Sequence, residues 1–185
     1  MAVDNIKCAN HWRQPVESEF QADFQSDWQA QLGGNGDTSG VSRMVLHFKE
    51  GMKIAQEFDV STEPNCAVVY SISFLATTQN RDMAYAYVKA HKGCKTLDDT
   101  PCGKTLCKKG YQGTNDVTTN EIKEIWKVAS ERFIGSASGN ITAFVENADE
   151  RSTFRRIELP NIIANKKIKT INGVDKFQFL QKFKK

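Results

Sequence analysis

The stretch from Arg151 to Glu158 (RSTFRRIE) carries the side chains of this sequence that are best suited to chemistry. It places hydroxyl, guanidinium and carboxylate groups within eight residues. Cleavage of a phosphodiester without a metal ion needs a base that takes the proton of the attacking hydroxyl. It also needs cations or hydroxyls that stabilise the charged phosphorane. The stretch therefore indicates a candidate site for metal-independent cleavage of RNA.

A β-strand over this stretch would divide its side chains between two faces. Alternation places Arg151, Thr153 and Arg155 on one face, and Ser152 and Glu158 on the other. Arg155 or Arg151 would hold a phosphate through paired N–H donors, and a hydroxyl of Thr153 or Ser152 would hydrogen-bond it. The same pattern also fits an edge strand whose arginines form salt bridges, and that interpretation stays open.

Proton transfer at such a site would fall to His91 or Glu158. His91 lies in the last turn of a helix expected over residues 81–92, where a cationic ring suits the helix dipole. A structural role is therefore the default for this histidine. The candidate catalytic set is His91, Thr153, Arg155 and Glu158, and Arg151 and Ser152 are candidate substrate-binding residues.

Two short segments, residues 93–96 and 103–105, resemble the end of a phosphate-binding loop. The complete motif needs a glycine five residues before its second glycine, and the chain has Asp98 there, so a P-loop is excluded. Small residues beside lysines can still bind one phosphate through backbone amides and charge. Lys95, Thr96 and Lys104 are therefore further substrate-binding candidates.

The five cysteines do not form a recognised metal or disulfide pattern. His91, Cys94, Cys102 and Cys107 have the donor types of a structural zinc site but an uncommon spacing. A zinc deaminase would need His-x-Glu, which is absent here, and two cysteines three residues apart. We expect no metal, no cofactor and mostly reduced thiols.

Charge is distributed unevenly along the chain. Residues 151–185 contain ten lysines or arginines against Glu158 and Asp175, a balance of +8, which leaves −5 on residues 1–150. A basic segment on an acidic body favours an anionic partner, either nucleic acid or an acidic protein. A solvated lysine-rich tail would show the same pattern.

The periodicity of the sequence predicts a mixture of helices and strands. Apolar residues every four positions indicate a helix that ends at the glycine-rich residues 33–40, namely at Phe20, Phe24, Trp28 and Leu32. Helices are also predicted over residues 81–92 and 120–134, the second with a capping box of Thr118 and Glu121. Strands are predicted over residues 41–48, 66–76, 140–146, 152–159 and 167–171. The fold class is therefore α+β, with a small antiparallel sheet packed against helices.

The length of the chain fits one domain, or one domain with an appendage. We expect residues 1–60 to form an N-terminal helical or adaptor segment that packs on or leads into an α+β domain of residues 61–185, although a single domain overall is also compatible. No apolar run approaches the ~20 residues of a membrane span, and the N-terminus lacks the features of a signal peptide. Export would therefore need a specialised secretion apparatus or a larger carrier protein.

Several segments together resemble the C-terminal toxin module of bacterial polymorphic toxins. Such modules form the C-terminal part of filamentous haemagglutinin-like and contact-dependent inhibition proteins, and similar modules occur in type VI secretion effectors. The likeness covers roughly residues 88–172 and is carried by residues 95–103, 125–126, 129–130, 136–145 and 152–160 with Asn165 and Ile168.

The resemblance implies a toxin for competition between bacteria. It would be made in the bacterial cytoplasm, act in the cytoplasm of a target cell, and be neutralised by a cognate immunity protein that binds its active face. The leading hypothesis is a metal-independent ribonuclease with RNA as its substrate.

Two other hypotheses remain. An NAD-directed toxin, either a glycohydrolase or an ADP-ribosyltransferase, would use Glu158 to stabilise an oxocarbenium-like centre and an arginine to hold the pyrophosphate. No Glu-x-Glu pair lies near the cluster, which disfavours the transferase. A non-enzymatic module would dock an acidic partner through its basic C-terminal surface.

Overall fold

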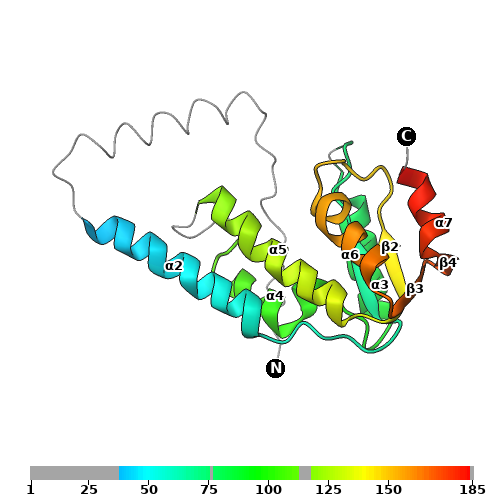
Figure 1. Cartoon of the computed structure of the whole chain (residues 1–185), viewed down its shortest axis with the longest axis horizontal. Coiled ribbons are helices and arrows are strands. Elements are labelled where there is room, and N and C mark those ends of the chain that lie inside the picture. The colour runs from blue at the N-terminus through cyan, green and yellow to red at the C-terminus, as the bar shows by residue number, and fades with distance from the viewer. Residues whose placement is uncertain (1–37, 76, 113–117, 184–185) are drawn as a thin grey trace.

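The structure, a computed structural model, describes residues 38–75, 77–112 and 118–183 (Figure 1). The helix predicted around Phe20 to Leu32 and the residue Cys8 lie outside the described residues. The helices are α2 (Thr38–Glu57), α3 (Gln79–Ala90), α4 (Pro101–Lys108), α5 (Thr119–Ser136), α6 (Leu159–Ala164) and α7 (Lys176–Leu180). The strands are β1 (Ala67–Tyr70), β2 (Gly139–Phe144), β3 (Ile168–Ile171) and β4 (Val174–Asp175). The short helical turns are η1 (Leu97–Asp99), η2 (Phe154–Glu158) and η3 (Gln181–Phe183).

The four strands form one mixed sheet in the order β1-β2-β3-β4. β1 pairs with β2 and β2 with β3 in parallel, whereas β3 and β4 are antiparallel. The expected α+β class is confirmed, but antiparallel pairing holds only for the last pair. The reason is that α3, α4 and α5 lie between β1 and β2, and η2 and α6 lie between β2 and β3. Such long crossovers return the chain in the same direction.

Figure 1 shows α2, α4 and α5 together on one side of the molecule, with the sheet, α3, α6 and α7 on the other. One large core joins the two groups and includes Ile54 of α2, Phe133 of α5 and Ile141 of β2. A smaller core lies between β1 and α3, where Val68 packs with Ala84. Successive residues of β1 thus serve different cores, as the alternation of a strand requires.

Two of the predicted strands are helical in the structure. Residues 41–48 belong to α2, a 20-residue helix that packs against α5, so their β-branched and aromatic composition does not decide their structure. Residues 152–159 form a helical turn that passes through η2 into α6. The Ser152 hydroxyl accepts a hydrogen bond from the Arg155 N–H at 3.2 Å, and the Ser152 carbonyl accepts one from the Arg156 N–H at 3.0 Å. The two-faced strand expected from Arg151 to Glu158 is therefore wrong.

The other elements predicted within the described residues are present. The helices expected over 81–92 and 120–134 are α3 and α5, and the strands expected over 140–146 and 167–171 are β2 and β3. The strand expected over 66–76 is shorter, since β1 ends at Tyr70. The capping box is confirmed, because the Thr118 N–H donates to Glu121 Oε2 at 2.9 Å and the Glu121 N–H donates to Thr118 Oγ1 at 3.3 Å. In the part of the chain that the structure describes, no helix is long and apolar enough to span a bilayer.

Two helical glycines give opposite expectations for substitution by alanine. A methyl group on Gly103, in the first turn of α4, would collide with the backbone of Leu97 and Asp98, so Gly103→Ala should destabilise the fold by about 2 kcal/mol. Gly135 in α5 has open space around it, so Gly135→Ala should be neutral or stabilise by up to about 1 kcal/mol. Urea unfolding of both variants measures the difference. Equal stability of the two would contradict the close packing of α4 on η1.

Candidate functional site

The loops that follow β1 and β2 lie beside each other at the carboxyl edge of the parallel strands. The Ser71 N–H donates to the Phe144 carbonyl at 3.0 Å, and the Phe74 N–H donates to the Asn147 carbonyl at 2.9 Å. A third hydrogen bond between the two loops runs from the Asp149 N–H to the Ile72 carbonyl at 3.0 Å. Ligands of open sheets with parallel strands bind at this edge, so the paired loops are the first place to look for a site.

Buried polar side chains fix these loops to the rest of the fold. Asn80, in the first turn of α3, donates to the carbonyls of Ser71 at 3.0 Å and Glu146 at 2.8 Å. The Ser71 hydroxyl also bonds the Ser152 hydroxyl at 2.9 Å, and both serines are buried. The two loops and the start of η2 are thereby held in one arrangement.

Glu158 is the last residue of η2, which is one turn of π-helix, and it is only 8% exposed. Its Oε2 atom has no hydrogen-bond partner within the described residues. Burial, together with the nearby charge of Asp98, raises the pKa of Glu158 to about 8. A buried carboxyl that titrates near neutral pH and lacks a partner is more typical of a functional site than of a structural contact.

Asp98 is the second carboxylate of the site and is held by two tyrosines. Its Oδ2 accepts hydrogen bonds from the hydroxyls of Tyr70, at the end of β1, at 2.6 Å and Tyr85 of α3 at 3.0 Å. Burial raises the pKa of Asp98, and the two hydrogen bonds oppose that effect only in part. Burial and the Asp98 charge raise the pKa values of both tyrosines, so their hydroxyls remain protonated donors.

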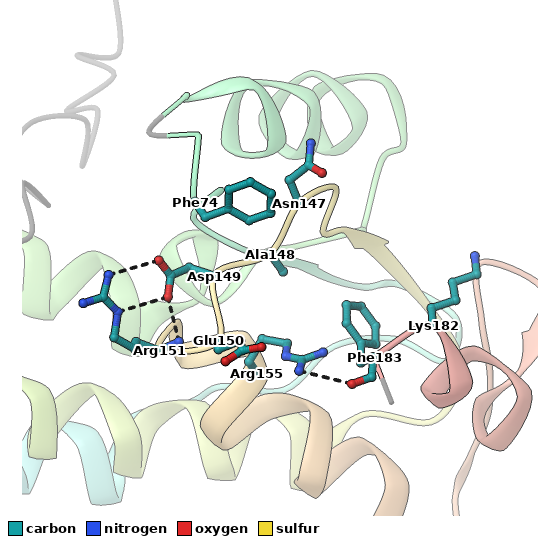
Figure 2. A pocket seen from close by; sticks show the side chains of 9 residues that line it. All are labelled: Phe74, Asn147, Ala148, Asp149, Glu150, Arg151, Arg155, Lys182 and Phe183. Atoms are coloured by element: carbon teal, nitrogen blue, oxygen red, sulfur yellow. Dashed lines mark hydrogen bonds and ion pairs between the residues drawn. The ribbon is translucent and has the colours of Figure 1, made fainter. Parts of the chain in front are cut away.

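An open recess of about 550 Å³ lies beside η2. Figure 2 shows the Arg155 and Phe183 side chains together on one side and Phe74 on another. The Arg155 guanidinium lies 4.5 Å from the centre of the Phe183 ring and donates to the Phe183 carbonyl at 3.4 Å. Lys182 adds a second cation to the wall. The recess combines the rings of Phe74 and Phe183 with three cations, Arg151, Arg155 and Lys182, and two carboxylates, Asp149 and Glu150.

The structure brings some of the proposed site residues together. Arg155 and Glu158 share the single turn η2, but only Arg155 lines the recess, whereas Glu158 is buried. Arg151 also lines the recess, where its Nε lies 3.3 Å from Asp149 Oδ1. The hydroxyl of Ser152 is committed to Ser71, which gives it a structural role. Thr153 is exposed and precedes η2.

The remaining candidates lie elsewhere. His91 directly follows the last residue of α3, and Asn80 lies at the other end of this helix. The His91 ring stacks on the Tyr87 ring with 3.7 Å between the ring centres, and its Nδ1 lies 2.9 Å from the Tyr87 carbonyl oxygen. The Thr96 hydroxyl donates to Asp99 Oδ2 at 2.7 Å. The backbone of Lys95 pairs with β1, and Lys104 is exposed on α4. Lys95, Thr96 and Lys104 therefore do not form a phosphate-binding site together. Lys95 and Thr96 belong instead to the short segment that precedes Asp98.

The cysteines show both oxidation states. Cys66, Cys94 and Cys102 are free, which agrees with mostly reduced thiols, whereas Cys107 is disulfide-bonded. Among the described residues, no group of three or more histidines, cysteines or carboxylates is placed to hold a metal ion. The Cys107 sulfur is therefore committed to a covalent bond rather than to the zinc set considered from the sequence.

Sequence reasoning missed Asp98 and its two tyrosines. Tyr70 ends an apolar run and Asp98 stands in a turn before Pro101, but the two are 28 residues apart. No local pattern connects them, because the contact depends on the pairing of Lys95 with β1. Glu158 was found only because its residue type suits proton transfer.

The pKa of Glu158 makes a prediction about stability. In the unfolded chain this carboxyl loses its proton near pH 4.5, whereas in the folded chain it keeps the proton to about pH 8. Between these values the unfolded state binds fewer protons, so the free energy of unfolding falls as the pH rises. Glu158→Gln should match the natural protein near pH 4.5 and be more stable by about 4 kcal/mol at pH 8. Denaturant unfolding at both pH values measures this, and a constant difference would show that Glu158 does not titrate in this range.

No protein-family model matches the sequence, and no curated protein matches it significantly. Among solved structures, the fold is similar to Aplysia cyclase complexed with substrate NGD and product cGDPR, at 18% identity and a TM-score of 0.45 over 68% of this chain and 61% of that chain. It is also similar to porcine CD38 complexed with a covalent intermediate, ribo-F-ribose-5'-phosphate, at 17% identity and a TM-score of 0.44 over 68% of this chain and 67% of that chain. The chain thus spans less than two thirds of the cyclase.

Proposed function

We propose that this chain is a glycohydrolase that cleaves the N-glycosidic bond between nicotinamide and ribose in an NAD-type dinucleotide. The observation that carries the proposal is the state of Glu158. It is a buried carboxyl with an unpartnered oxygen, placed near a second carboxylate, the half-buried Asp98.

The two carboxylates suit a substrate that is itself positively charged. No cation contributes to the raised pKa of Glu158, which burial and Asp98 alone produce. A pyridinium ring beside Glu158 would supply the missing positive charge and favour the ionised carboxylate. Substrate binding would therefore generate the form of Glu158 that the reaction needs.

The chemistry follows from that charge. When the bond between the ring nitrogen and the ribose breaks, the ring leaves as a neutral base and the sugar becomes oxocarbenium-like. A carboxylate next to the anomeric carbon stabilises this cation or bonds to it, as in glycoside hydrolysis. Glu158 takes this role, and water then attacks the anomeric carbon. Asp98 adds a second negative charge whose position Tyr70 and Tyr85 fix.

The recess supplies groups for the rest of a dinucleotide. A pyrophosphate needs cations with N–H donors, which Arg155 and Lys182 present on the same wall. A base needs a flat apolar surface, which the rings of Phe74 and Phe183 offer. Because Arg155 and Glu158 share η2, the phosphate contact and the reacting bond would be held by one segment.

The ribonuclease hypothesis loses the observation on which it was based. It required a strand that presents hydroxyl, arginine and carboxylate side chains on defined faces, and this stretch is helical. The Ser152 hydroxyl is occupied by Ser71 and by the Arg155 N–H. The NAD-directed hypothesis accordingly takes its place.

The resemblance to polymorphic toxin modules supports a biological setting for this activity. In that setting the protein is an effector that a specialised secretion system or a larger carrier protein delivers into the cytoplasm of a competing cell. A cognate immunity protein would protect the producing cell by covering the recess beside Arg155. Loss of NAD would then be the cause of growth arrest.

Removing the carboxylate should abolish the reaction without unfolding the protein. We expect Glu158→Gln to lower kcat/KM for NAD hydrolysis by at least about a thousandfold, because the amide cannot stabilise the developing cation. Release of nicotinamide, followed by chromatography, measures the rate. Glu131→Gln is the matched control, because Glu131 is exposed on α5 and outside the recess, and it should leave the rate unchanged. A Glu158→Gln variant as active as the control would refute the assignment.

Arg155 should act on binding more than on chemistry. We expect Arg155→Ala to raise KM for NAD by about tenfold or more, with kcat changed much less, since it removes a phosphate contact. Arg156→Ala removes the same charge from the adjacent residue, which is exposed and outside the recess, and should behave as the natural protein. Equal KM values for the two variants would show that the recess does not bind the pyrophosphate.

A further inference from the structure

The thiols of Cys66 and Cys94 lie next to each other in the structure. The Cys94 Sγ donates a hydrogen bond to the Cys66 Sγ at 2.7 Å, and both thiols are free. Cys94 is buried and Cys66 is half-buried. Neither residue takes part in the proposed reaction.

Backbone pairing holds the two cysteines opposite each other. Ala67 pairs with Lys95 in a parallel bridge, so the preceding residues, Cys66 and Cys94, face each other. The Lys95 N–H donates to the Cys66 carbonyl at 3.0 Å, and the Val68 N–H donates to the Lys95 carbonyl at 2.9 Å. Paired chains lie about 4.8 Å apart, which falls within the roughly 4.4–6.8 Å between the Cα atoms of disulfide-bonded cysteines. A bond between the two sulfurs requires little movement of the backbone.

We infer that Cys66 and Cys94 form a reversible thiol–disulfide site that reacts with low-molecular-weight disulfides. Cys66, the more accessible sulfur, attacks a disulfide such as oxidised glutathione, bonds to one of its sulfurs and releases the other as a thiol. The Cys94 sulfur then displaces the bound glutathione from Cys66. Two protein thiols become one disulfide while one glutathione disulfide becomes two thiols, which also take up the two protons.

The order of the two steps follows from the environment of each sulfur. Burial and the contact with Cys66 raise the pKa of Cys94 to about 11, so this residue remains a thiol at neutral pH. Both displacements need a thiolate, so Cys94 would react only slowly with a disulfide from solution. Cys94 is better suited to the second step, in which the mixed disulfide lies directly against it.

The disulfide would tie down the segment that carries Asp98. Cys66 directly precedes β1, and Cys94 directly precedes residues 95–98, so two short parallel segments run from the cysteine pair to the hydrogen bond between Tyr70 and Asp98. The segment with Asp98 is attached to β1 by the backbone hydrogen bonds of Lys95. A covalent bond at its base should suppress local opening of residues 95–100.

The experiment incubates the full chain with oxidised and reduced glutathione at defined ratios, followed by alkylation, peptide mass mapping and amide hydrogen exchange. We expect a peptide that links Cys66 to Cys94, a loss of two free thiols per chain, and about fivefold slower exchange of the amides in residues 95–100. Cys102→Ala should behave in the same way. Cys94→Ser should instead retain a glutathione adduct on Cys66, and Cys66→Ser should form neither product.

Two results would overturn the inference. One is the absence of a link between Cys66 and Cys94 even when oxidised glutathione is in about hundredfold excess over the reduced form. The other is a link that forms without slowing exchange in residues 95–100 relative to the Cys66→Ser variant. Neither result depends on whether the protein hydrolyses NAD, so the test is independent of the proposed function.

Discussion

Two neighbouring carboxylates, the buried Glu158 and the half-buried Asp98, are the constraint on which the rest of the site depends. Taking a carboxylate out of water is unfavourable unless a partner compensates it, and the two raise each other's cost when both are charged. The fold compensates Asp98 with the hydroxyls of Tyr70 and Tyr85 and leaves Glu158 without such help. The positively charged ring of the proposed substrate would provide this compensation.

The connections of the sheet explain how the two carboxylates meet. β1 and β2 are parallel neighbours, so the loops that follow them emerge at the same edge, and Asn80 and Ser71 fasten these loops to each other and to η2. Glu158 arrives on η2 after β2, whereas Asp98 arrives on η1, because the chain before it pairs with the free side of β1. The site is thus formed by segments that follow three adjacent extended chains. The rigidity of its geometry therefore depends on the backbone hydrogen bonds that pair these chains.

The sequence predicts the parts of this structure that depend on local interactions. The helix α5, with its capping box and its stripe of buried apolar residues, could be predicted with its ends nearly in place. Residues 152–159 could not, because a short stretch with hydroxyl, aromatic and β-branched residues fits a strand or a turn of helix equally well. In the folded chain, where this stretch is helical, the Ser152 hydroxyl forms a hydrogen bond with Ser71, which lies 81 residues earlier in the sequence. Glu158 and Arg155 could be picked out by residue type alone, but Asp98 and its tyrosines depend on contacts that only the folded chain makes.

The measurement that tests the central claim most directly is made in a laboratory bacterium that carries the gene under tight repression. Total RNA and NAD are sampled within minutes of induction, before secondary effects of arrested growth appear. Cleavage at the nicotinamide–ribose bond predicts a rapid fall in NAD while ribosomal and transfer RNA stay intact. Fragmented RNA with NAD preserved would contradict the account and return the basic residues around η2 to a role in binding RNA.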